Sequence, residues 1–125
     1  MENKLDIAPT SVTPEIRFNI EERKFLIQGR SMPEDTEAYY SQIIQWVRKN
    51  LNDQKITANF DVVLEYYNTG SFIRLMTLFI LLVELNKKGN KFSVRWFCEE
   101  DDQDNIDSGQ SFKDVLDLPF TTHFI

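Results

Sequence analysis

The sequence predicts a single α/β domain built on one mixed four-stranded sheet that carries helices. Four β-rich segments alternate with helical patterns along the 125 residues. Three polar residues alone separate the first two segments, which is typical of a hairpin. Each later segment follows a helix, and such β-α-β crossovers are right-handed and join parallel strands. We therefore expect one domain over residues 1–125, with residues 1–12 as a loosely ordered lead-in.

The first half of the chain supplies the hairpin and one helix. Residues 14–19 alternate between apolar and polar side chains, and residues 24–28 form the second strand. Gly29 is expected to end that strand. The sequence Ser31-Met32-Pro33-Glu34 has the pattern of a capping box with an early proline, which predicts a helix start. Apolar residues then recur at helical spacing as far as Leu51 and predict an amphipathic helix of about five turns.

The second half begins with a nearly continuous apolar run over residues 56–67, typical of a central strand covered on both faces. A helix is expected from residue 70 to 88, with more apolar surface than one sheet face needs. Residues 91–98 form the fourth strand. Residues 99–110 are expected to be an acidic loop, and residues 111–116 a short last helix.

Composition and charge exclude several classes of protein. The only cysteine, Cys98, cannot form an internal disulfide, and the first residues lack the pattern of a signal peptide, so we expect a cytoplasmic protein. The most apolar stretch, residues 75–83, is shorter than the about 20 residues that span a membrane. The net charge is −6, and six carboxylates lie within residues 99–107. Without a basic stripe, nucleic-acid binding is not expected.

Catalytic, cofactor and metal sites are not expected either. His123 is the only histidine, and no glycine-rich phosphate loop is present. An EF-hand count from Asp102 fails, because it puts Lys113 where the bidentate glutamate belongs. The acidic segment is therefore interpreted as solvated, with a role as an electrostatic docking surface left open. The sequence favours a protein that is not an enzyme.

The turn Asn68-Thr69-Gly70-Ser71 is the strongest candidate for a functional site. It joins a buried strand to an apolar helix, and its plain interpretation is a helix cap. A hydroxyl at this position also lies beside free N–H groups and the positive end of the helix dipole, which stabilise a phosphate. Phosphorylation would bring about −1.5 to −2 of charge to the surface. It would repel a partner docked through apolar contacts, for which Tyr66, Tyr67, Phe72 and the surplus apolar residues of the helix are candidates.

The chain resembles the SiaC family of bacterial regulatory phosphoproteins from about residue 5 to 120. The resemblance rests on the order and spacing of five motifs: Thr13-Pro14-Glu15-Ile16-Arg17-Phe18, Gly29-Arg30-Ser31-Met32-Pro33-Glu34, Leu64-Glu65-Tyr66-Tyr67-Asn68-Thr69-Gly70-Ser71, Val94-Arg95-Trp96-Phe97 with the acidic run after it, and Leu118-Pro119-Phe120. It implies a fold similar to that of STAS-type anti-sigma-factor antagonists.

The same resemblance implies a partner-switching regulator. A kinase phosphorylates the threonine of an Asn-Thr-Ser-Ser turn, and a PP2C-type phosphatase reverses the reaction. The unphosphorylated form binds and activates a diguanylate cyclase and so promotes biofilm formation. Carried over, Thr69 is the phosphoacceptor and Ser71, which matches the last serine, is a second candidate. Gly70 departs from the family pattern, because the family usually has serine there.

Other interpretations remain open at this stage. Arg30 is expected near the turn, where it could pair with a phosphate. One alternative function is a constitutive scaffold or dimerisation domain that uses the apolar helix as an interface. Another is a small-ligand-binding α/β domain with a pocket at the carboxyl ends of its parallel strands.

Overall fold

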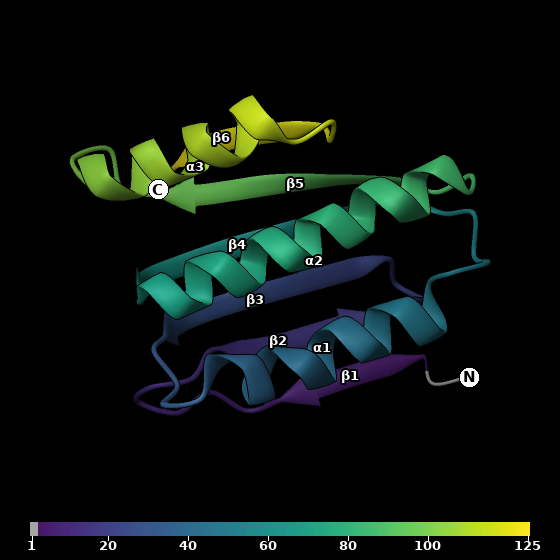
Figure 1. The fold of residues 1–125 in the computed structure, drawn as a ribbon, viewed down its shortest axis with the longest axis horizontal. Coiled ribbons are helices and arrows are strands. Elements are labelled where there is room, and N and C mark those ends of the chain that lie inside the picture. The colour runs from purple at the N-terminus through teal and green to yellow at the C-terminus, as the bar shows by residue number, and fades with distance from the viewer. Residues whose placement is uncertain (1–2) are drawn as a thin grey trace.

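The computed structural model describes residues 3–125, which form a two-layer α/β domain (Figure 1). Six strands make one sheet in the order of the sequence: β1 (Lys4–Ile7), β2 (Glu15–Asn19), β3 (Lys24–Ser31), β4 (Thr57–Tyr67), β5 (Lys91–Cys98) and β6 (Phe120–Phe124). Strands β1 to β3 pair antiparallel, and β3 to β6 pair parallel. The helices α1 (Thr36–Asn50), α2 (Thr69–Lys87) and α3 (Gln103–Val115) supply the crossovers and all lie on one face of the sheet. The parallel arrangement of β3, β4 and β5 confirms the prediction.

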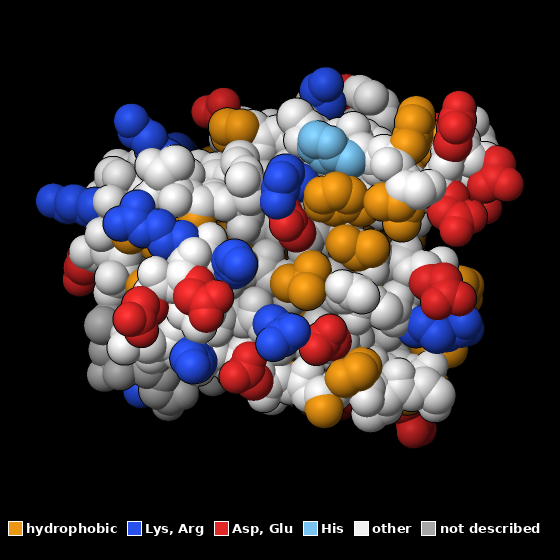
Figure 2. Space-filling model, turned by 180° about the vertical axis from the view of Figure 1, so that it is seen from behind, with side chains coloured by type: hydrophobic (Ala, Val, Ile, Leu, Met, Phe, Trp, Pro, Cys, Tyr) orange, Lys and Arg blue, Asp and Glu red, His pale blue; other side chains and the backbone are white. Residues whose placement is uncertain are grey.

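Alternation along the strands divides the sheet into a core face and an open face. The core face carries the large buried side chains under the helices: Ile16, Phe18, Phe25, Ile27, Phe60, Val62, Leu64, Phe92, Val94 and Trp96. None of the helices described over residues 3–125 covers the other face. The expectation that β4 is covered on both faces is therefore wrong, since alternate β4 residues from Thr57 to Glu65 are exposed or half-buried. Figure 2 shows this open face, with apolar side chains gathered toward one side and acidic side chains at the adjacent rim.

The prediction of four strands is also wrong, because β1 and β6 flank the predicted set. Strand β1 lies in the expected lead-in, of which residues 1 and 2 fall outside the described residues. Strand β6 lies in the expected tail. Both are edge strands of four and five residues with few buried side chains. Their pairing comes from the backbone hydrogen bonds that a neighbouring strand offers, which an apolar pattern does not reveal.

The strand before α1 is longer than predicted. Gly29 does not end β3; it adopts φ +120°, and the register with β4 shifts between Gly29 and Arg30. Ser31 is the last residue of β3 and is buried, so it is not a helix cap. The cap of α1 is Asp35, whose carboxylate accepts a hydrogen bond from the amide of Ala38 at 3.0 Å.

The acidic segment is largely helical, which corrects both the expected loop and the expected short last helix. Asp102 caps α3 by accepting a hydrogen bond from the amide of Asn105 at 3.2 Å. Carboxylates at a helix N-terminus are stabilised by the dipole, so the charge of this segment favours the helix. The indole of Trp96 donates to both the carbonyl and the side-chain oxygen of Asn105, at 3.0 and 2.7 Å, which ties the helix to the sheet.

Helix α2 is the central helix of its layer, and it is the most apolar of the three helices described. By length and composition alone it could cross a membrane, but such a signal is weak because core helices give it too. Here its buried residues, among them Leu75, Leu78, Phe79 and Leu82, pack on the sheet. Ile73 and Ile80 of the same helix are exposed, so the helix has apolar surface beyond what the core uses.

Candidate functional site

The turn between β4 and α2 presents Thr69 at the first position of the helix. Strand β4 ends at Tyr67, and Asn68 caps α2 by accepting a hydrogen bond from the amide of Ser71 at 2.8 Å. The first helical bond runs from the amide of Phe72 to the carbonyl of Asn68 at 3.1 Å. Thr69 is exposed. Its side chain therefore lies in solvent beside the amino end of a helix, where N–H groups have no intrahelical partner.

A buried hydrogen-bond network holds this turn against the end of β3. The hydroxyl of Ser71 donates to the carbonyl of Ser31 at 2.9 Å and accepts from the hydroxyl of Ser31 at 2.8 Å. The hydroxyl of Tyr40 therefore donates to Ser31 Oγ, at 2.6 Å. The amide of Asn68 also reaches the Ser31 carbonyl, at 3.0 Å. Burial raises the pKa of Tyr40 to about 12, so its hydroxyl keeps the proton that this network needs.

Gly70 lies where the amino ends of α1 and α2 meet. A Cβ at this position would be 2.6 Å from Thr36 Oγ1 and 2.9 Å from Thr36 Cγ2. Atoms at such distances overlap, so the glycine is required by space at this contact. The glycine at position 70 therefore has a structural counterpart in Thr36.

The proposed contact residues separate into two groups. Tyr67 and Phe72 are half-buried and serve the core: the Tyr67 hydroxyl donates to Ser108 Oγ, and the ring of Phe72 stacks on Phe112 at 4.5 Å between centroids. Tyr66 is 49% exposed and lies across the register from Arg30.

Arg30 precedes Ser31 at the end of β3 and pairs across the register with Tyr66. Its guanidinium is 3.6 Å from the Glu65 carboxylate and 5.6 Å from the centre of the Tyr66 ring. Arg30 therefore interacts with two side chains of β4 on the open face.

Four of the surplus apolar residues of α2 form one exposed to half-buried surface. At 100° per residue, Ile73, Met76, Ile80 and Val83 all project within about 40° of the direction of Thr69 on α2. We call these four residues the α2 ridge. Ile73 is 51% exposed and Ile80 is 47% exposed, while Met76 and Val83 are half-buried. Thr69 thus stands at the end of an apolar surface, and the surplus of apolar residues in this helix was the signal for it.

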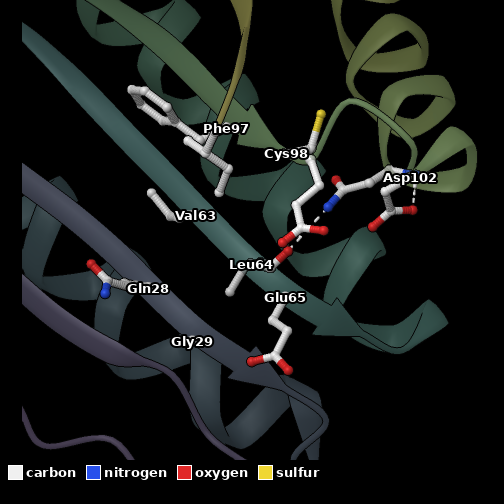
Figure 3. Close-up of a pocket in the computed structure, with 11 residues that line it drawn as sticks. Gln28, Gly29, Val63, Leu64, Glu65, Phe97, Cys98 and Asp102 are labelled. Carbon is white, nitrogen blue, oxygen red and sulfur yellow. Dashed lines mark hydrogen bonds between the residues drawn. The ribbon is translucent and has the colours of Figure 1, made fainter.

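A hollow lies on the open face at the carboxyl ends of β3, β4 and β5 (Figure 3). Its volume is about 450 Å³, and it is lined by Gln28, Gly29, Val63, Leu64, Glu65, Phe97, Cys98, Glu99, Asp102, Asn105 and Ile125. Burial raises the pKa of the Cys98 thiol, which keeps it protonated and unreactive. Within residues 3–125, no group of three or more histidine, cysteine or carboxylate residues is arranged to hold a metal ion.

Comparison with known proteins places the chain among regulators. The chain is 29% identical over 116 residues to an uncharacterized protein of Pseudomonas aeruginosa (strain UCBPP-PA14), covering 93% of this chain and 92% of the relative. The crystal structure of apo-SiaC from Pseudomonas aeruginosa is similar with a TM-score of 0.86 and 29% identity, covering 98% of this chain and 99% of that one.

A second similar structure contains the diguanylate cyclase SiaD in complex with its activator SiaC, also from Pseudomonas aeruginosa. It matches with a TM-score of 0.86 and 29% identity over 95% of this chain and 99% of that chain. The family model described as SiaC family regulatory phosphoprotein matches residues 7–125. The chain belongs to the SiaC family of regulatory phosphoproteins.

Proposed function

We propose that this protein is a phosphorylation-switched binding module of a cytoplasmic partner-switching pathway, with a STAS-like architecture. Its unphosphorylated form binds and activates a diguanylate cyclase. A kinase that acts on Thr69 and a PP2C-type phosphatase control it. The observation that carries the proposal is the position of Thr69, exposed at the first residue of α2 and continuous with the α2 ridge.

Accessibility favours Thr69 over Ser71 as the phosphoacceptor. Ser71 is fully buried, and its hydroxyl is bonded to both the carbonyl and the hydroxyl of Ser31. A kinase would have to open this network and detach the turn from β3 to reach it. The Thr69 hydroxyl is in solvent, on a turn whose backbone is held in place by the same network. The network therefore presents Thr69 without exposing Ser71.

The charge of a phosphate explains how the switch would act. A phosphate on Thr69 is favoured by the amino end of α2, which keeps the modified protein folded. The same dianion lies at the end of the α2 ridge, where a partner must remove water from Ile73 and its neighbours. Desolvating a phosphate without a matching cation is costly, so phosphorylation lowers affinity for a partner docked there.

The partner is inferred from the relatives. A SiaC protein of similar structure is found in complex with the diguanylate cyclase that it activates. We infer the same class of partner for this chain. The apolar α2 ridge, with Tyr66 exposed at the same end of the sheet, supports a protein partner more than a small ligand.

Two measurements test the proposal. Incubation with the cognate kinase and ATP, followed by peptide-level mass spectrometry, should place one phosphate on Thr69 and none in Thr69→Ala. Titration calorimetry with the cyclase should then show weakened binding for Thr69→Glu. Thr57→Glu is the matched control, since Thr57 is also exposed but lies at the opposite end of β4. Equal binding by wild type and Thr69→Glu, or a phosphate elsewhere, would favour a constitutive scaffold.

A further inference from the structure

The hollow on the open face has a chemistry distinct from that of the Thr69 turn. It opens on the face without helices and reaches the start of α3 at Asp102 and Asn105, whereas Thr69 begins α2. Its volume of about 450 Å³ is within the range of sites that hold a small ligand or a few side chains.

The walls of the hollow combine an apolar floor with an acidic rim. Val63 and Phe97 are half-buried side chains of neighbouring strands and form the floor. Glu65, Glu99 and Asp102 supply carboxylates, and no lysine or arginine lines the hollow. Figure 3 shows these strands ending side by side, with Glu65 reaching from β4 toward β3.

Two arginines lie beside this rim, and Arg95, whose guanidinium is 5.5 Å from the centre of the Phe97 ring, is already paired with Asp61 at 2.6 Å. Glu65 has one long ion pair, with Arg30 at 3.6 Å, and both side chains are substantially exposed. The Asp102 carboxylate accepts only an amide hydrogen bond at the start of α3. Across residues 3–125, the salt bridges of the structure do not include Glu99. The exposed residues Glu100 and Asp101 follow directly and add to the negative potential.

We propose that the hollow docks a lysine or arginine side chain of a partner polypeptide, together with an apolar neighbour of that residue. The methylene stem of such a side chain covers apolar surface while its charged end stays at a polar rim. Val63 and Phe97 offer that surface, and Glu65 and Glu99 are the opposite charges. A neutral or acidic segment would leave these carboxylates desolvated without a partner, so the hollow selects for cationic segments.

A polypeptide suits the surroundings of the hollow better than a free cation. Ile125 is 66% exposed at one side of the hollow, and Tyr66 lies next to Glu65 at the other. Residues that flank the bound cation therefore meet exposed apolar side chains. Contacts of this kind are available to a peptide chain and are lost to an isolated ammonium or guanidinium ion.

Amide-resolved NMR titration of the full chain tests this with three capped peptides, acetyl-Leu-Arg-Leu-amide, acetyl-Leu-Gln-Leu-amide and acetyl-Leu-Glu-Leu-amide. The arginine peptide should shift the amides of Val63, Cys98 and Asn105 in a saturable way, and the other two should not. Acetyl-arginine-amide should bind more weakly than the arginine peptide, because it lacks the apolar neighbours. Equal shifts from all three peptides, or no saturable shift, would overturn the proposal.

Variants locate the binding. Glu99→Gln should weaken the arginine peptide about threefold, the size expected for one partly exposed ion pair. Glu100→Gln is the matched control, because Glu100 is the next residue and does not line the hollow. Equal weakening by the two variants would show that binding is to the diffuse charge of the acidic segment, and would refute docking in the hollow. Spectra of the free variants, unchanged away from the substitution, exclude misfolding as the cause.

Discussion

Replacing Gly70 by alanine puts a methyl group into the contact between the amino ends of α1 and α2. The added carbon would be 2.6 Å from Thr36 Oγ1, 2.9 Å from Cγ2 and 3.2 Å from Cβ. Rotation of Thr36 about χ1 cannot remove the overlap, because its Cβ is itself too close and both branches are involved. Gly70 has an ordinary helical backbone, so the obstacle is space and not conformation.

The magnitude follows from two opposing effects. Overpacking of a well-packed contact costs about 1–3 kcal/mol. Alanine in place of glycine favours a helix by up to about 1 kcal/mol, and less in the first turn. The free energy of unfolding should therefore fall by about 1–2 kcal/mol in Gly70→Ala. Thr36→Ala removes Oγ1 and Cγ2, which are the two closest atoms, and alone should change stability by no more than about 0.5 kcal/mol.

Urea unfolding followed by the fluorescence of Trp46 and Trp96 measures these values. The double variant Gly70→Ala, Thr36→Ala should regain most of the loss, which gives a coupling energy of about 1 kcal/mol or more. An additive double variant, or a Gly70→Ala protein at least as stable as wild type, would refute the steric argument. Gly70→Ser should behave like Gly70→Ala, so a serine at this position requires a smaller neighbour at position 36.

Two further substitutions test the packing below the turn and under α3. Tyr40→Phe removes the donor to Ser31 Oγ and should lower the free energy of unfolding by about 1 kcal/mol near neutral pH. Burial raises the pKa of Tyr40 to about 12, whereas the pKa of an unfolded tyrosine is near 10. The free energy of unfolding of wild type should therefore fall as the pH rises from about 10 to 12, and its difference from Tyr40→Phe should shrink over that window. A constant difference in urea unfolding across the window would contradict this. Phe112→Ala should lower the free energy of unfolding by about 3–5 kcal/mol, because the fully buried ring of Phe112 contacts the rings of Phe72, Phe79 and Trp96. A small change in the thermal unfolding temperature would mean that the surrounding side chains close the cavity.

The central elements could be predicted from the sequence because each contains the apolar pattern that identifies it. Strands β3, β4 and β5 and helix α2 carry the apolar runs that fill the core, and their order gives the parallel arrangement. The edge strands β1 and β6 could not, since their pairing is supplied by the neighbouring strand. Covering β4 on both faces was a wrong inference from an apolar run whose alternate members, such as Val63, line the open face.

Most of α3 was not predicted, and only residues 111–115 fall within the expected short last helix, because the buried face of α3 is not hydrophobic in the usual sense. Its buried residues are Asn105, Gly109 and Phe112, which have helical spacing but include an amide and a glycine. A Cβ on Gly109 would be 2.8 Å from Trp96 Cδ1, so the glycine leaves room for the indole of Trp96. The same indole donates a hydrogen bond to the side chain of Asn105. This complementarity joins residues of different elements, and no local pattern contains it.

The candidate site shows the same division. The turn follows from local sequence, which predicts a cap among its polar residues, and the structure has that cap at Asn68. The network that fixes the turn joins Ser31, Tyr40 and Ser71, which come from three elements. The sequence indicated that Ser31 caps α1, because a capping-box pattern is local, whereas its true partner is 40 residues away.

The α2 ridge and the hollow differ in how their binding should depend on salt, and this separates them in one experiment. Docking on Ile73 and Ile80 is apolar, so moderate salt should change it little. Docking of a cation against Glu65 and Glu99 is electrostatic, so its affinity should fall as ionic strength shortens the range of the field. A phosphate on Thr69 should have opposite effects on the two surfaces. It opposes apolar docking on the α2 ridge, but it adds negative charge at the end of the sheet where the hollow lies and so favours a bound cation there. Binding of the cyclase should therefore be lost on phosphorylation at both low and high salt, whereas the arginine peptide should bind the phosphorylated protein at least as well as the unmodified one at low salt. Parallel loss of both ligands on phosphorylation would show that the two surfaces are coupled through a change in the fold, and not through charge alone.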